Sequence, residues 1–248
     1  MLAARILGPL LIVAIVVGIG YAAVRASQDP RLALVAVNVT GCDRSAPEDV
    51  ISAAAFPVGQ NIWLLDVAGA KNRIEALPWV GTTVVRRTWP NHVAIDIVER
   101  VPVARLVLPS GGGEEPSASE ALLDERLRVL AVGPPDPRDL QLPTLTVNSL
   151  SSNAVRPGAD LHATAAAPAL RALQSLQAGG LAVVSVQLDD VTGIAAQSAS
   201  GIHVLFGAPD DLARKIALFL SIEKKINRPR DVRYVDVRSL RAPTVLFK

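Results

Sequence analysis

The stretch from residue 77 to residue 105, LPWVGTTVVRRTWPNHVAIDIVERVPVAR, constrains the fold more than any other part of this sequence. Residues Val80 to Thr88 and His92 to Val98 are rich in β-branched side chains, which predicts two strands. Between them, Trp89-Pro90-Asn91 predicts a turn, because proline fixes its own φ and asparagine tolerates turn geometry. We expect Pro102 to end the pairing, since it has no N–H for a ladder. The stretch therefore predicts a β-hairpin.

The second predicted strand has two different faces, because successive side chains of a strand point to opposite sides. The apolar face comprises Val93, Ile95 and Ile97, and the mixed face comprises Ala94, Asp96 and Val98. The hairpin contains no nucleophile, general base or set of metal ligands. It therefore predicts a packing element with one side turned to a core.

A strand and two helices are expected before the hairpin. Residues 32–39 alternate enough to be a strand, and Ser45 with Glu48 matches a capping box, with Pro47 in the first turn of a helix over 46–55. Asp66 can cap a second helix. The inward residues are then Val50, Ile51 and Ala54 in the first helix, and Val67, Ala70, Ile74 and Leu77 in the second. The resulting order of elements is β-α-α-β-β.

The sequence of this region resembles the POTRA module of the FtsQ/DivIB bacterial cell-division family. The matching pieces are Leu77-Pro78-Trp79-Val80, Val85-Arg86-Arg87, Trp89-Pro90-Asn91 and the run VERVPVA over residues 98–104. The resemblance implies a POTRA domain over residues 31–100, with both helices on one face of a small sheet whose edges can accept a partner strand. The motif residues, read as mainly structural, are Pro78, Trp79, Arg86, Trp89, Pro90, Glu99, Arg100, Pro102 and, near the end of the chain, Asp236.

The N-terminus predicts a membrane anchor. Residues 6–24 include no charged side chain, and as a helix they would cover roughly 28 Å, close to the thickness of the hydrocarbon core. A cleaved signal peptide is the alternative, but the apolar run exceeds the usual ~7–15 residues of a signal core. We expect a stub over 1–5, a transmembrane helix over 6–24 and a linker over 25–30. The family resemblance implies a single-pass protein of the inner (plasma) membrane, with its C-terminal domains periplasmic, at the division septum.

Residues 101–248 predict a second domain in which strands outnumber helices. Residues 109–120 read as a flexible loop, and residues 163–177 and 209–225 read as helices. The closing strands are expected at 232–237 and 244–247. This pattern resembles the β domain of FtsQ. The predicted fold class is α+β: an N-terminal transmembrane helix, a small β-α-α-β-β POTRA domain, and a mixed-sheet β domain with two helices.

The end of the chain carries the partner-binding hypothesis. The string Tyr234-Val235-Asp236-Val237-Arg238 is similar to a family motif, and the resemblance implies that the final strands bind the FtsB/DivIC and FtsL division proteins by strand addition. Carried over by position, the partner-binding residues are Arg238, Ser239, Arg241, Val245 and Phe247. A last strand often has one unpaired side. Folding back of this strand into its own core is the open alternative.

The sequence offers no constellation for catalysis. His92, His162 and His203 are isolated from other ligand types, and the single Cys42 excludes an intrachain disulfide. A net charge of +2 gives no strong attraction to nucleic acid. We expect no cofactor, no small-molecule substrate and no enzymatic activity, but a scaffold of the division complex. The alternatives are a membrane-anchored envelope enzyme and a POTRA module of outer-membrane assembly or secretion.

Overall fold

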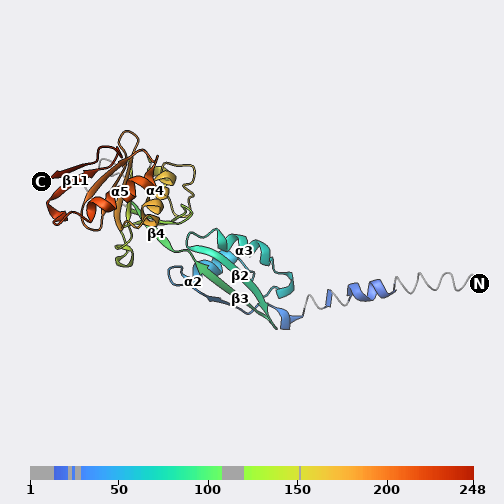
Figure 1. Ribbon diagram of the computed structural model, residues 1–248. Coiled ribbons are helices and arrows are strands. Elements are labelled where there is room, and N and C mark those ends of the chain that lie inside the picture. Colours follow the sequence, from blue (N-terminus) through green and yellow to red (C-terminus); the bar gives the residue numbers. More distant parts are fainter. Residues whose placement is uncertain (1–13, 22–23, 26–28, 108–119, 151) are drawn as a thin grey trace, which may run out of the picture. The chain divides into compact units, whose positions relative to one another are not determined.

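The described part of the chain forms two compact units, each with its own buried core. The computed structural model describes residues 14–21, 24, 25, 29–107, 120–150 and 152–248 (Figure 1). The boundary between the units falls between Glu99 and Arg100.

Residues 6–13, 22 and 23 of the predicted N-terminal anchor lie outside the described residues, as do the stub over 1–5 and all of the predicted loop except residue 120. Residues 14–21 are helical and exposed. Within the described residues, no helix combines the length and the apolar character needed to reach across a bilayer. The anchor therefore stays a prediction.

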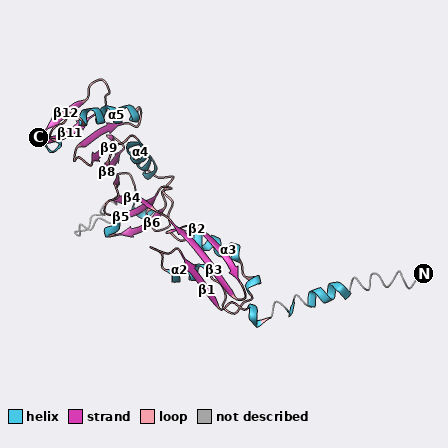
Figure 2. Cartoon of the chain, turned by 60° about the horizontal axis from the view of Figure 1, so that its bottom comes forward, coloured by secondary structure: helices cyan, strands magenta, loops and turns pink. Residues whose placement is uncertain are grey.

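The first unit confirms the expected order β-α-α-β-β. Its three-stranded sheet has the order β1-β3-β2, with β1 parallel and β2 antiparallel to β3 (Figure 2). The elements are η1 (Pro30–Leu32), β1 (Ala36–Thr40), α2 (Pro47–Ala54), η2 (Ile62–Leu64), α3 (Val67–Glu75), β2 (Val80–Thr88) and β3 (His92–Glu99).

Both helices of the first unit pack against the apolar face of its sheet. Val93, Ile95 and Ile97 are buried as predicted, and Val98 on the opposite face is exposed. From the helices, Val50 and Ala54 and then Ala70 and Ile74 enter the same core. The expectation for Ile51 is wrong: it is exposed, because one residue past Val50 the helix has already turned by about 100° away from the core.

Two other expectations for this region need correction. The first strand begins at Ala36, because Pro30–Leu32 forms a 3₁₀ turn capped by the Asp29 carboxylate. The capping box does not form: Ala46 is the N-cap of α2 and no side chain caps the helix. The β2–β3 ladder ends at Glu99, before Pro102 as expected, and Pro102 opens the next strand, β4, since the first residue of a strand can do without its N–H.

The second unit is built on a nine-stranded mixed sheet with the order β12-β11-β10-β9-β8-β7-β4-β5-β6. Helices α4 and α5 pack against one face of it, and alternate residues of the strands complete that core. The β4/β7, β7/β8 and β10/β11 pairs are parallel, and the others are antiparallel. The two predicted helices and the two closing strands are confirmed within a few residues. The elements are β4 (Pro102–Val107), β5 (Glu120–Asp124), β6 (Val129–Gly133), η3 (Pro137–Asp139), β7 (Thr144–Val147), η4 (Ser152–Ala154), α4 (Ala166–Ala178), β8 (Val183–Asp189), β9 (Gly193–Ser198), β10 (His203–Gly207), α5 (Leu212–Glu223), η5 (Pro229–Asp231), β11 (Val232–Asp236) and β12 (Thr244–Phe247).

Candidate functional site

Strand β12 lies at one edge of the nine-stranded sheet. Within the described residues, β11 is its one strand partner, in an antiparallel register that pairs Val235 with Val245 and Asp236 with Thr244. Lys248 continues this ladder, because its N–H donates to the Asp231 carbonyl at 2.8 Å. Backbone groups of alternate residues in a strand point to opposite sides. The N–H and C=O groups of Val245 and Phe247 therefore line the outer side of β12.

The side chains of β12 differ in burial. Val245 is half-buried and packs against the core of the second unit, whereas Phe247 is 60% exposed and Leu246 is 39% exposed. The sequence left two alternatives for this strand: an open edge, or folding back into its own core. Each holds for part of β12. Val245 folds back onto the core, and Phe247 remains on the surface at the edge.

The three other predicted partner-binding residues lie in the loop between β11 and β12, and all are exposed. The Arg238 guanidinium donates to the Asp236 carboxylate, with Nη2–Oδ2 at 2.7 Å and Nε–Oδ2 at 3.0 Å. Hydrogen bonding from the Arg238 side chain lowers the pKa of Asp236, although partial burial opposes this effect. The same contact raises the pKa of Arg238.

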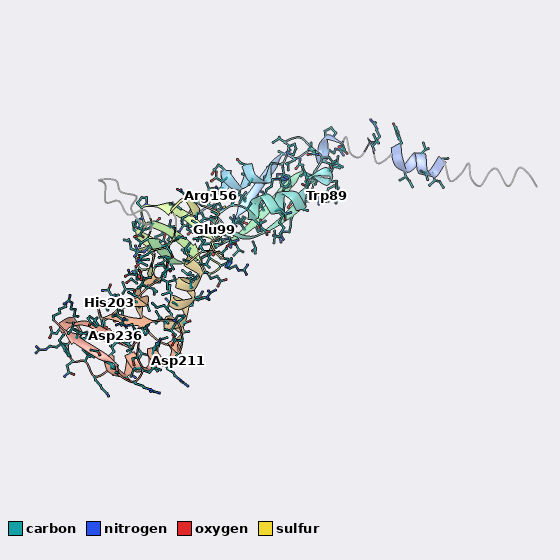
Figure 3. The ribbon with its side chains drawn as sticks, turned by 90° about the horizontal axis from the view of Figure 1, so that it is seen from above. Trp89, Glu99, Arg156, His203, Asp211 and Asp236 are labelled. Carbon is teal, nitrogen blue, oxygen red and sulfur yellow. The ribbon has the colours of Figure 1, made fainter. Side chains whose placement is uncertain are left out.

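The Asp236–Arg238 pair closes the turn that follows β11 (Asp236 is labelled in Figure 3). The Arg238 N–H also donates to the Asp236 carboxylate at 3.0 Å. Gly207 lies against the Arg238 side chain. It has φ +68°, and a Cβ at this position would lie only 2.9 Å from Arg238 Cγ, which is too close for ordinary packing. This motif pair therefore has a structural role, which positions the loop bearing Ser239 and Arg241.

Two of the other sheet edges are partly occupied by the chain itself. At β6, the Val129 N–H donates to Ala159 and its carbonyl accepts from Gly158, at 2.9 and 2.8 Å. At β2, the Thr83 N–H donates to the Glu75 carboxylate at 3.0 Å. These contacts occupy edge groups that a partner strand would need.

Strand β1 resembles β12 in having one strand partner within the described chain. Its exposed side chains, however, are the polar Asn38 and Thr40. Strand β12 instead exposes Leu246 and Phe247, so it combines open backbone groups with apolar side chains. Edges of that kind favour strand addition.

A groove of about 590 Å³ lies between α3 and β2 in the first unit. Val67, Ala68 and Lys71 line one side of it, and Val84 and Val85 line the other. No local sequence pattern indicates this groove, because it depends on the spacing between a helix and a strand.

The motif residues of the first unit support its fold. Pro78 and Trp79 form the turn between α3 and β2, where the Val80 N–H donates to the Leu77 carbonyl at 3.3 Å. The Arg44 guanidinium lies 5.2 Å above the Trp79 ring, and Arg86 forms an ion pair with Asp96. At the hairpin turn, Pro90 follows Trp89, whose ring contacts that of Trp63.

Glu99 anchors the segment before α2. Its carboxylate accepts hydrogen bonds from the backbone N–H groups of Asp43, Arg44 and Ser45, at 2.7 to 3.1 Å. Burial alone would raise the pKa of Glu99, but these N–H groups together hold it below its usual value. The next residue, Arg100, instead donates to the Asp124 carboxylate at 2.8 Å.

The described residues include no group of three or more His, Cys, Asp or Glu side chains arranged to hold a metal ion. His162 lies 4.0 Å from the Asp160 carboxylate, and both side chains are exposed. Burial, followed by the nearby carboxylates of Glu99 and Glu48, raises the pKa of the Cys42 thiol. A raised pKa makes a thiol a poor nucleophile at neutral pH.

Comparison with known proteins assigns the first unit directly. A family profile described as "POTRA domain, FtsQ-type" matches residues 32–100. The chain is 38% identical to the cell division protein FtsQ of Myxococcus fulvus over 79 residues, which cover 32% of this chain and 28% of that relative. It is 32% identical to FtsQ of Corynebacterium glutamicum over 73 residues, or 29% of this chain and 33% of that relative. The match thus spans about a third or less of these two relatives.

A longer match reaches into the second unit. FtsQ of Streptomyces collinus is 27% identical over 228 residues, which cover 86% of this chain and 77% of that relative. The POTRA unit and this longer match agree on one assignment. The first unit matches a POTRA domain of the FtsQ type, and the chain is similar to FtsQ cell-division proteins over most of its length.

Proposed function

We propose that this chain is a single-pass membrane scaffold of the bacterial division complex. In this proposal it resides in the inner (plasma) membrane at the septum, with both units periplasmic, and it recruits and regulates septal division proteins by contact and catalyses no reaction. The FtsQ-type POTRA match and the similarity to FtsQ cell-division proteins support the role in division. The uncharged run over residues 6–24 supports the anchor.

The proposed partners are an FtsB/DivIC-like and an FtsL-like division protein. A segment of the FtsB-like partner would add a strand beside β12 and so extend the nine-stranded sheet. The observation that carries this proposal is the outer side of β12, which lacks a strand partner in the described chain and displays Phe247. The loop with Arg238, Ser239 and Arg241 would flank the added strand.

The energetics of such an edge suit a moderate, specific interaction. Each net backbone hydrogen bond contributes about 0.5–1.5 kcal/mol, and full burial of a phenylalanine side chain contributes about 1.5–3 kcal/mol. Phe247 supplies both an outward N–H and an exposed ring. It is therefore the residue at which the proposal can be tested most sharply.

The test compares Phe247→Pro with Phe247→Ala in binding to the FtsB-like protein of the same organism. The alanine variant removes the ring, whereas the proline variant removes both the ring and the outward N–H. Edge strands tolerate proline where the N–H faces away from the sheet. We expect Phe247→Ala to weaken binding about tenfold or more, and Phe247→Pro to weaken it by a further ~2- to 10-fold.

Thr244→Ala serves as the control, because Thr244 is exposed and polar and its backbone faces β11. Deletion of residues 238–248 should abolish binding while the POTRA unit keeps its fold. Circular dichroism checks that the point variants retain their secondary structure. Equal affinities of the folded Phe247→Pro variant and the wild type would exclude β12 as the binding edge.

A further inference from the structure

The hairpin end of the POTRA unit carries an exposed apolar cluster that the partner-binding proposal does not use. Trp63, Leu64 and Trp89 are 53%, 59% and 63% exposed. The two indole rings form an edge-to-face pair with centroids 5.8 Å apart and an interplanar angle of 64°. Val35 and Val58 are also exposed. We call these five residues the tryptophan patch.

Hydrogen bonds connect the segment that carries Trp63 to Asn61 and to Arg87 of β2. Asn61 is 7% exposed, and its side-chain oxygen accepts from the backbone N–H of Trp63 at 2.9 Å. Arg87 donates from Nε to the Ile62 carbonyl at 2.6 Å, and its guanidinium lies 5.9 Å from the Trp63 ring. These contacts tie the segment that carries Trp63 to strand β2.

Further backbone contacts bring the remaining residues of the patch to the same end. The Val35 N–H donates to the carbonyl of Asn91 in the hairpin turn at 2.9 Å. Gly59, next to Val58, donates to the Leu34 carbonyl at 3.0 Å. Three segments far apart in the sequence thus meet here.

The segments that form the patch carry few charges, and those within them are basic. The segments 30–40, 55–65 and 84–95 contain no aspartate or glutamate, and their charged or titratable residues are Arg31, Arg86, Arg87 and His92. Asp29, Asp66 and Asp96 lie at the borders of these segments. Asp96 forms an ion pair with Arg86, which leaves Arg31 and Arg87 as the cations of these described segments that have no such ion pair within them. Basic side chains around exposed tryptophans complement anionic lipid headgroups.

The patch is also close, along the chain, to the proposed anchor. Ala33 forms an isolated β-bridge with Asn61, two residues before Trp63. Ala33 follows Val24, the last residue of the predicted span, by nine residues, which extend over at most about 32 Å. Residues 30–32 form a 3₁₀ turn, which shortens the connection further.

We propose that the tryptophan patch rests in the headgroup region of the bilayer and docks the hairpin end of the POTRA unit on the membrane surface. The occupant is the lipid bilayer, because indole rings prefer the membrane–water interface, where the ring is partly buried and its N–H stays hydrated. This inference rests on the proposed membrane anchoring. It assigns Trp63 and Trp89 a contact beyond their mutual packing.

The sequence supplies an internal control for this proposal. The chain has three tryptophans, and the third, Trp79, precedes Val80 at the opposite end of the β2–β3 ladder, where Val80 pairs with Glu99. Eight residue steps separate Val80 from Thr88, or about 27 Å along an extended strand. Figure 3 shows Trp89 and Glu99 toward opposite ends of this unit.

The test uses the full chain reconstituted in phosphatidylethanolamine/phosphatidylglycerol vesicles whose acyl chains are brominated. Single-tryptophan variants retain Trp63, Trp89 or Trp79, with phenylalanine at the other two positions. We expect brominated lipid to quench the emission of Trp63 and Trp89, and to leave that of Trp79 unchanged. Fluorotryptophan labelling of the wild-type chain, with spin-labelled lipid, repeats the comparison by ¹⁹F NMR without any substitution.

Two readouts separate this inference from the anchor on which it rests. Flotation of the vesicles after an alkaline carbonate wash reports the anchor itself, and loss of the chain from the vesicles would remove the basis of both proposals. If the chain floats but Trp63 and Trp89 stay accessible to aqueous acrylamide and are not quenched by brominated lipid, docking on the bilayer is excluded. The patch would then be a surface left open for a protein.

Discussion

Glu99 and Arg100 are neighbours in the chain, yet each is bound within a different unit. The Glu99 carboxylate holds backbone N–H groups of the POTRA unit, whereas the Arg100 guanidinium holds Asp124 in the second unit. Like Glu99, Asp124 also holds backbone groups of its own unit: its carboxylate accepts from the N–H groups of Arg126 and Arg128 at 2.9 and 2.8 Å. One dipeptide of the family motif therefore serves two separate cores. We call the contacts of the Glu99 carboxylate the Glu99 clamp and those of the Asp124 carboxylate the Asp124 clamp. A substitution of either carboxylate should reveal whether the units unfold independently.

The largest expected effect is that of Asp124→Ala in the second unit. The Arg100 and Asp124 side chains are 17% and 4% exposed, and breaking a buried ion pair costs about 3–5 kcal/mol. All three tryptophans belong to the POTRA unit, so their fluorescence reports that unit alone. In urea unfolding of the full chain in detergent, the far-UV circular dichroism transition should move to lower urea. The tryptophan transition should stay in place.

Glu125→Ala is the matched control for this variant. Glu125 is adjacent to Asp124, but its side chain is 74% exposed and lies 3.9 Å from Arg126. Exposed ion pairs contribute about 0–1 kcal/mol, so the control should unfold like the wild type. A joint shift of both transitions in Asp124→Ala would show that the two units unfold as one.

A smaller effect is expected for Glu99→Ala in the POTRA unit. This change removes the acceptor of the Asp43, Arg44 and Ser45 N–H groups, two of which are partly buried. Loss of such an acceptor costs about 1–3 kcal/mol, and the tryptophan transition should report it. Glu48→Ala is the comparison, because Glu48 belongs to the capping box that the structure does not form. If Glu48→Ala destabilised the unit as much as Glu99→Ala, the clamp would not be the main anchor of this segment.

The Glu99 clamp shows what the sequence could reveal about the first unit. The alternation of Val93, Ile95 and Ile97 is a local pattern, and it predicted the buried face correctly. Ser45 and Glu48 formed an equally good local pattern, yet Glu99, more than fifty residues away, takes the Ser45 N–H. Contacts that depend on the paired strands cannot be found by spacing along the chain.

The candidate site shows the same division between local and tertiary information. The closing strands were predictable from their β-branched residues, and the family motif pointed to this end of the chain. The strand order that puts β12 at an edge results from the parallel pairing of β10 with β11, which no local signal encodes. The motif likewise gave no indication that the Arg238 side chain donates to the Asp236 carboxylate. This contact makes Arg238 part of the turn as well as a candidate partner contact.

The smallest expected effect is a pH dependence that belongs to the POTRA unit. Hydrogen bonds lower the pKa of Glu99 from its ordinary value of 4.5, so in acid the unfolded chain binds more protons at this group than the folded chain does. Its stabilising contribution is therefore complete above pH 4.5 and is lost as the pH falls through the lower, folded-state pKa. Urea midpoints from tryptophan fluorescence should decline across this window in the wild type, and less steeply in Glu99→Gln, which cannot titrate. Parallel declines in the two proteins would mean that other carboxylates control the acid stability of the unit, and that the clamp acts without its charge.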